Sequence, residues 1–143
     1  MYIFSSKLEK VIHINKVRIS LLEEGIIENF FLGGKAIEPA DMWEAKAINL
    51  KFSKDKPYTV LVLAEELTSF SIETRELVAS KDFQGKNIAK ALVFDGLGQR
   101  IIANFYMRVN RPHIKTAVFG DRQRAILWLQ DELAKYYKSG NPL

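Results

Sequence analysis

The stretch 95–124 constrains the fold of this chain more than any other. A short apolar run ends at Phe94, and the following segment, 97–110, carries apolar residues three and four positions apart, as an amphipathic helix does. Pro112 ends that segment, because the residue before a proline disfavours helical backbone. A second apolar run, 115–119, follows, and a last helix begins near Gly120. The order strand–helix–strand–helix predicts an α/β fold.

Helical spacing also predicts which side chains are buried. We expect the segment 97–110 to turn one apolar stripe toward a sheet; the stripe consists of Leu97, Ile101, Ile102, Phe105, Tyr106 and Val109. The residues expected in the core are Leu61, Val62, Phe94, Phe105 and Leu129.

The rest of the chain extends the same pattern. Residues 17–32 alternate around Glu23-Glu24-Gly25, which predicts an antiparallel hairpin. Strands are expected at 58–64 and 89–94, with helices beginning near Pro39 and Ser71. Helices that alternate with apolar strands indicate parallel pairing. The prediction is therefore an α/β fold with a mixed sheet, in which the hairpin is antiparallel, the later strands are parallel and helices cover the sheet.

Length and composition fit one soluble domain. We interpret 17–138 as a single domain, 1–16 as an N-terminal extension that forms a short strand or a helical turn, and 139–143 as a tail. The absence of cysteine excludes disulfides and thiol catalysis and fits a reducing compartment. No signal peptide or membrane-spanning run is recognisable, so a cytoplasmic location is expected.

Positive charge is concentrated in one part of the chain. The formal net charge is +4, and the stretch 95–124 accounts for all of it. The candidate interaction surface consists of Arg100, Arg108, Arg111, Lys115, Arg122 and Arg124. We expect it to contact an acidic partner surface, for which the Glu-rich hairpin turn of a second copy in a homodimer is one candidate. The alternative is a solvated face. No nucleic-acid-binding motif accompanies these residues.

Acidic and hydroxyl side chains follow the ends of the parallel strands. In open α/β sheets ligands bind at the carboxyl ends of the strands. The candidate ligand-edge residues are Glu65, Glu66, Ser71, Asp95 and Asp121. Helix capping and solvation of loops are the alternative roles.

No motif for a cofactor, a metal or catalysis is complete. Gly96 and Gly98 follow a strand, but the third glycine of a dinucleotide loop is replaced by Ile101. The two histidines, His13 and His113, have no recognisable metal-binding partners. We therefore predict no cofactor, no metal and no catalytic residue.

The order of elements resembles the STAS, or SpoIIAA-like, family of bacterial anti-sigma-factor antagonists. The segments 102–112, 115–119 and 121–129 carry the most specific likeness, to an uncharacterised bacterial branch. The resemblance implies a SpoIIAA-like fold. The family's phosphorylatable serine would fall near Ser71, but the Asp-Ser-Ser-Gly-like motif is missing, so a capping role for Ser71 is expected.

These observations lead to one function hypothesis and two alternatives. The hypothesis is a non-enzymatic STAS-like regulatory or protein-interaction module in a bacterial cytoplasm. The first alternative is a protein that binds a small apolar ligand or lipid. The second is an enzyme that uses the strand-end loops.

Overall fold

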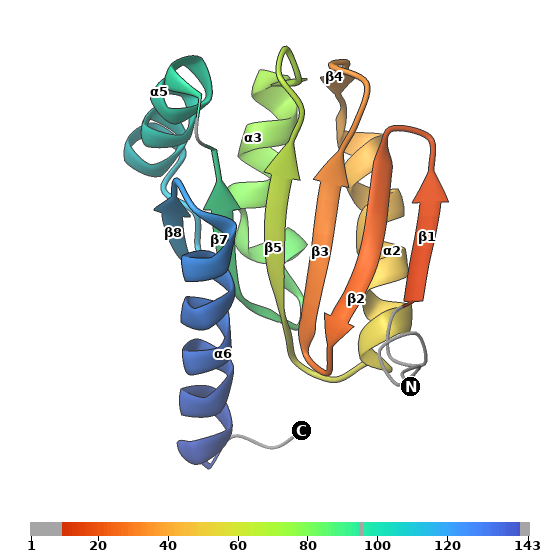
Figure 1. Ribbon diagram of the computed structural model, residues 1–143, viewed down its shortest axis with the longest axis vertical. Helices are drawn as coiled ribbons and strands as arrows, with labels where there is room; N and C mark the ends of the chain where they lie inside the picture. Colours follow the sequence, from red (N-terminus) through yellow and green to blue (C-terminus); the bar gives the residue numbers. More distant parts are fainter. Residues whose placement is uncertain (1–9, 95, 141–143) are drawn as a thin grey trace.

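The structure is a computed structural model that describes residues 10–94 and 96–140. Its centre is a six-stranded sheet with the order β1-β2-β3-β5-β7-β8 (Figure 1). The strands are β1 Lys10–Ile14, β2 Val17–Glu23, β3 Ile26–Phe31, β5 Tyr58–Ala64, β7 Asn87–Val93 and β8 Lys115–Phe119. A short second pair joins β4 Ala36–Ile37 to β6 Ser69–Phe70.

Pairing within the sheet changes from antiparallel to parallel at β3. Strands β1, β2 and β3 form an antiparallel meander, and β3, β5, β7 and β8 are parallel. The predicted mixed sheet is confirmed. The described part of the N-terminal extension forms the edge strand β1, while residues 1–9 lie outside the described part of the chain.

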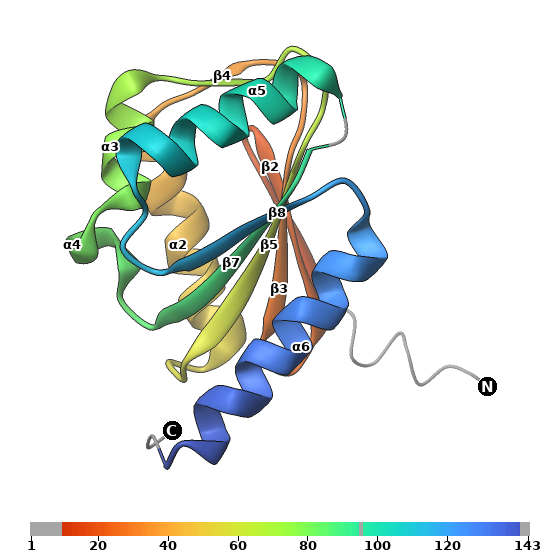
Figure 2. The same cartoon turned by 90° about the vertical axis from the view of Figure 1, so that its left-hand side faces the viewer.

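Helices cover the two faces of the sheet unequally (Figure 2). One face carries α2 Pro39–Ser53, α3 Ile72–Ala79, α4 Lys81–Gln84, α5 Leu97–Phe105 and the π-helical turn η1 Tyr106–Asn110. The long helix α6 Arg122–Lys138 lies alone on the other face. Strands β5 and β7 are therefore covered on both faces, as their nearly continuous apolar sequences predict.

Each face of the sheet has its own apolar core. Leu61 and Leu129 are buried in the core under α6, and Val62 and Phe94 in the core under the other helices, as predicted. The predicted burial of Phe105 is wrong, because its side chain is 43% exposed. Helix α5 crosses the ends of the strands (Figure 2) and turns Ala103 inward, and Tyr106 at the start of η1 is also buried. Tyr106 is therefore the buried member of the predicted stripe, and its other five residues are exposed.

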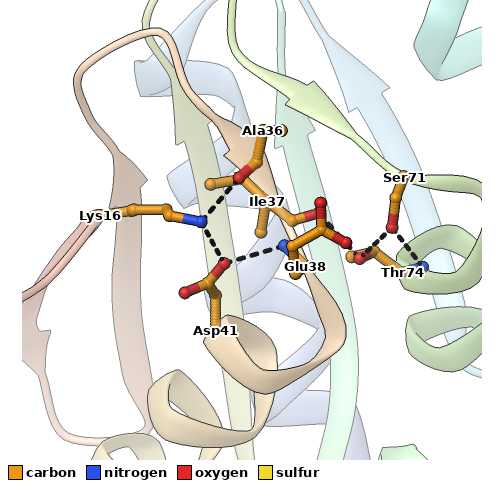
Figure 3. Close-up of polar contacts among 7 residues, drawn as sticks. All are labelled: Lys16, Ala36, Ile37, Glu38, Asp41, Ser71 and Thr74. Atoms are coloured by element: carbon orange, nitrogen blue, oxygen red, sulfur yellow. Dashed lines mark hydrogen bonds and ion pairs between the residues drawn. The ribbon is translucent and has the colours of Figure 1, made fainter.

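The beginning of α2 is joined to the turn between β1 and β2 (Figure 3). The Nζ atom of Lys16 donates to the Ala36 carbonyl and to the Asp41 carboxylate, both at 2.8 Å. The same carboxylate accepts from the Glu38 N–H at 2.8 Å. Burial alone would raise the pKa of Asp41, but Lys16 and the Glu38 N–H hold it below its ordinary value.

The beginning of α3 is fixed in a similar way. The Ser71 hydroxyl caps the helix by accepting from the Thr74 N–H at 3.1 Å, as expected. The Thr74 hydroxyl in turn donates to the Ile37 carbonyl at 2.8 Å. These contacts hold α2 and α3 side by side over the sheet and leave a space beneath them.

Candidate functional site

A cavity of about 90 Å³ lies between the sheet and the helices α2, α3 and α5. Apolar side chains dominate its lining, among them Phe31, Val60, Val62, Leu92 and Phe94. Ligand sites in proteins combine such a lining with a few polar groups. The polar side chains that line this cavity are Asn29, Lys46, Asn49, Tyr58, Arg75, Gln84, Asn87, Lys90 and Tyr106.

Lys90 is one of two equally buried lysines at the cavity. It lies on β7, inside the sheet, and only 8% of its surface is exposed. Its Nζ atom donates to the Tyr106 hydroxyl at 2.8 Å and lies 3.4 Å from the Val78 carbonyl. Burial, and to a lesser extent the charge of Lys46, lowers the pKa of Lys90 to about 7.

Lys46 enters the same cavity from α2. Its Nζ atom donates to the Gln84 carbonyl at 2.9 Å and lies 3.4 Å from the Tyr58 hydroxyl. The Phe83 ring lies against it, with the centroid 4.5 Å from Nζ. Burial lowers the pKa of Lys46 to about 8. Burial also raises the pKa of the Tyr58 phenol, so Tyr58 stays neutral beside the lysine.

Two further polar atoms that line the cavity, the Nε atom of Arg75 and the Oδ1 atom of Asn87, have no hydrogen-bond partner among the described residues. The Arg75 guanidinium is held through its Nη1 atom, which donates to the Phe70 carbonyl at 2.6 Å. Asn29 and Asn49, in contrast, satisfy each other through two amide hydrogen bonds of 2.9 and 3.1 Å. Buried polar groups are normally hydrogen-bonded, so the two unpaired atoms mark places where a ligand or water would bind.

Three basic side chains line the cavity, and none of them forms an ion pair with a described residue. Within the described part of the chain, no ion pair includes Lys46, Arg75 or Lys90. Buried cations are usually paired with carboxylates. An anion could therefore be stabilised here by groups that the fold itself leaves uncompensated.

A second feature is a group of exposed apolar side chains on α5 and η1, one of which, Ile102, also lines the cavity. Leu97, Ile101 and Val109 are 78%, 61% and 55% exposed, and Ile102 and Phe105 are also exposed. We call these five residues the α5 stripe. The Arg75 guanidinium, on α3, lies 5.8 Å from the centroid of the Phe105 ring. A continuous apolar surface on a helix is typical of an interaction site.

The predicted basic surface divides into two groups. Arg100, Arg108 and Arg111 are exposed on or just after α5 and η1, next to the α5 stripe. No ion pair in the described residues includes these three arginines. Arg111 contacts its own helix, since its Nε atom lies 3.4 Å from the Arg108 carbonyl.

The other three predicted basic residues are engaged around α6. The Arg122 guanidinium contacts the carboxylate of Glu28, a buried residue of β3, at 2.8 Å. Lys115 pairs with Glu132 at 3.0 Å. Arg124 lies 4.0 Å from the carboxylate of Asp121. These contacts give Arg122 and Lys115 structural roles apart from the α5 stripe.

Most of the predicted ligand-edge residues make local contacts. Glu65 accepts from the Gly33 N–H, and Ser71 caps α3. Asp121 caps α6 by accepting from the Gln123 N–H at 3.1 Å. Glu66 is exposed, and Asp95 lies outside the described residues. Glu65, Ser71 and Asp121 therefore each have a local structural contact at this edge of the sheet.

Sequence reasoning missed both cavity lysines, although each leaves a signal. Lys90 occupies an inward position of β7, two residues before Leu92 in an otherwise apolar run. Lys46 lies one helical turn after Met42, on the buried side of α2. A charged residue on the apolar face of an element is unusual, and this irregularity points to the cavity.

Among the described residues, no group of three or more His, Asp or Glu side chains is arranged to hold a metal ion. In the same part of the chain, no helix has the length and apolar character needed to span a bilayer.

Comparison with known proteins assigns a family. An uncharacterised protein from Shewanella loihica PV-4, of the DUF3478 family with a SpoIIAA-like fold, aligns with a TM-score of 0.47 and 10% identity. The alignment covers 85% of this chain and 91% of that protein. No curated protein matches. Residues 20–133 match a family described as a domain of unknown function, and the chain therefore belongs to the DUF7793 family.

Proposed function

We propose that this protein is a non-enzymatic, STAS-like interaction module that binds a partner protein through the α5 stripe. The observation that carries the proposal is the exposure of five large apolar side chains on one short helical segment. Exposed apolar surface is unfavourable in water by roughly 25 cal/mol per Å². A partner that covers the stripe would remove this unfavourable contact with water.

The charges beside the stripe indicate the chemistry of the partner. Arg100, Arg108 and Arg111 are all arginines, whose planar guanidinium groups pair well with carboxylates. Arginine and aromatic residues are enriched in protein interfaces, and Phe105 supplies the aromatic side chain. We therefore propose that the partner is a protein whose binding surface is apolar and is bordered by Asp or Glu.

The strand-end loops support a reaction less well. Ser71 and Asp121 are helix caps, and Glu65 binds the backbone of Gly33. Each of these side chains has a local structural contact, which favours binding over catalysis at this edge.

Site-specific photo-crosslinking in the native host tests the proposal. A photoreactive residue replaces Ile101 on the stripe, or Leu127 as a matched control. Leu127 is 56% exposed on α6, and α6 lies on the opposite face of the sheet (Figure 2). We expect a crosslink to an acidic protein from position 101 but not from position 127. With that protein purified, Ile101→Ser should weaken binding about tenfold or more. Leu127→Ser should not change it.

The charge contribution is measured on the same pair of proteins. Arg108→Glu should weaken binding, and salt should weaken binding of the wild type more than of the variant. Equal crosslinking from both positions would contradict the proposal. A crosslink to a second copy would instead identify a homodimer, and vesicle binding that depends on Ile101 would identify a membrane surface; both results would overturn the assigned partner.

A further inference from the structure

We infer that the cavity beneath α2, α3 and α5 is a binding site for a small organic carboxylate, whose carboxyl group contacts Lys90 and Lys46 and whose apolar part contacts the sheet. This inference is independent of the α5 stripe. It rests on cations that face an apolar cavity without an acidic partner among the described residues.

The polar contacts leave donors available for a carboxylate. An ammonium group has three donors, and Lys90 directs one to Tyr106 and a longer one to Val78. Lys46 similarly contacts Gln84 and Tyr58. Each lysine therefore retains a donor that its protein contacts do not use. The unpaired Nε atom of Arg75 adds a permanent cationic donor at the same cavity.

The volume of the cavity limits the ligand. An engineered protein cavity of about 150 Å³ holds benzene, so about 90 Å³ suits an acid of roughly four or five non-hydrogen atoms. The aliphatic lining from Val60, Val62 and Leu92 favours an alkyl group over a second charge. Propionate combines the carboxylate with an alkyl group of this size.

Propionate binding should depend on pH because Lys90 and Lys46 lose their protons near neutral pH when the cavity is empty. The pKa of Lys90 is about 7 and that of Lys46 about 8, whereas propionate is ionised throughout this range. Tyr58 and Tyr106, whose pKa values burial raises, remain neutral in this range. A carboxylate favours the protonated lysines, so affinity should fall as pH rises above 7.

Isothermal titration of the full chain with propionate tests the inference. We expect a dissociation constant of about 1 mM or lower at pH 6.5, and binding at least tenfold weaker for the neutral isostere propionamide. If binding of one propionate is coupled to the uptake of one proton, the affinity should fall by up to tenfold from pH 7.5 to pH 8.5. The observed heat should vary with the ionisation enthalpy of the buffer, as proton uptake requires.

Variants locate the site. Lys90→Met should weaken propionate binding at least tenfold, and Lys46→Met should also weaken it. Lys51→Met is the matched control, since Lys51 lies exposed on the same helix as Lys46, and its affinity should equal that of the wild type.

The propionamide comparison tests the inference even if a cavity variant fails to fold. Absence of propionate binding at 10 mM ligand would overturn the inference. Equal affinity for propionamide, or unchanged binding by Lys90→Met, would also overturn it.

Discussion

Replacement of Lys90 by methionine should stabilise the protein, although it removes a hydrogen bond. Burial lowers the pKa of Lys90 from 10.5 to about 7. One pKa unit corresponds to about 1.4 kcal/mol, so burial of this amine disfavours folding by on the order of 4 kcal/mol at pH 7. Methionine retains much of the apolar volume but leaves the Tyr106 hydroxyl without its 2.8 Å partner, a loss of about 1–3 kcal/mol. The expected net stabilisation is about 2 kcal/mol.

The pH dependence separates this explanation from a general packing effect. Because the folded pKa of Lys90 is below the unfolded value, the unfolded chain binds more protons between about pH 7 and 10.5. Wild-type stability should therefore rise with pH in that window, by up to about 1.4 kcal/mol per pH unit from this group. The Lys90→Met variant should lack this contribution, and its advantage should shrink to near zero by pH 9.

Urea unfolding at pH 7 and pH 9, followed by circular dichroism, measures both effects. Lys51→Met serves as the control because Lys51 is exposed on α2, and it should unfold like the wild type at both pH values. The reasoning is refuted if Lys90→Met is less stable than the wild type at pH 7. An identical pH dependence of stability in the two proteins would refute it as well.

Three further predictions, two of them with a comparison variant, test the packing of the molecule by urea unfolding. Arg122→Ala should destabilise the protein by about 2 kcal/mol, because it leaves a buried carboxylate on β3 unpaired. The exposed Arg124→Ala control should change stability by less than about 0.5 kcal/mol, and equal effects would contradict the assigned roles. Phe105→Ala should cost less than about 1 kcal/mol, whereas the fully buried Leu129→Ala should cost about 2–5 kcal/mol; a large effect at Phe105 would place it in the core. Ser71→Ala should cost about 1 kcal/mol through loss of the α3 cap, and no change would show that the cap is dispensable.

Local patterns were sufficient to predict most of the sheet. Alternation in 17–32 and the apolar run at 58–64 correspond to strands β2, β3 and β5, because period-two burial and two-sided burial leave distinct sequences. Ser71 was predictable as a cap for a similar local reason, since its hydroxyl binds a backbone N–H only three residues later.

The orientation of α5 was not predictable in the same way. Helical spacing shows that Leu97, Ile101 and Phe105 share a side, but it does not show what that side contacts. In the structure α5 turns Ala103 toward the core, and of the predicted stripe only Tyr106, at the start of η1, is buried. The wide distribution of apolar residues around this helix made both orientations compatible with the sequence.

The cavity could not be predicted because it depends on contacts between distant elements. Lys46 and Lys90 are 44 positions apart and line one cavity only when the folded sheet and the helices over it bring α2 and β7 to the same space. Within the predicted basic surface, Arg100 and Arg108 are exposed whereas Arg122 is bound to Glu28; the interaction itself stays a prediction. An ion pair between residues 94 positions apart leaves no local signal in the sequence.

We propose that buried lysines without an acidic partner among the described residues form an anion site, and the protonation state of Lys90 is the property to measure. Protein labelled with ¹³C at lysine Cε can be titrated by NMR with and without saturating propionate, and Lys90→Met assigns the resonance. We predict a pKa near 7 for Lys90 in the free protein, and a rise of at least one pKa unit when propionate is bound. A Lys90 resonance that titrates near 10.5 in the free protein, or one that propionate leaves unchanged, would contradict the account.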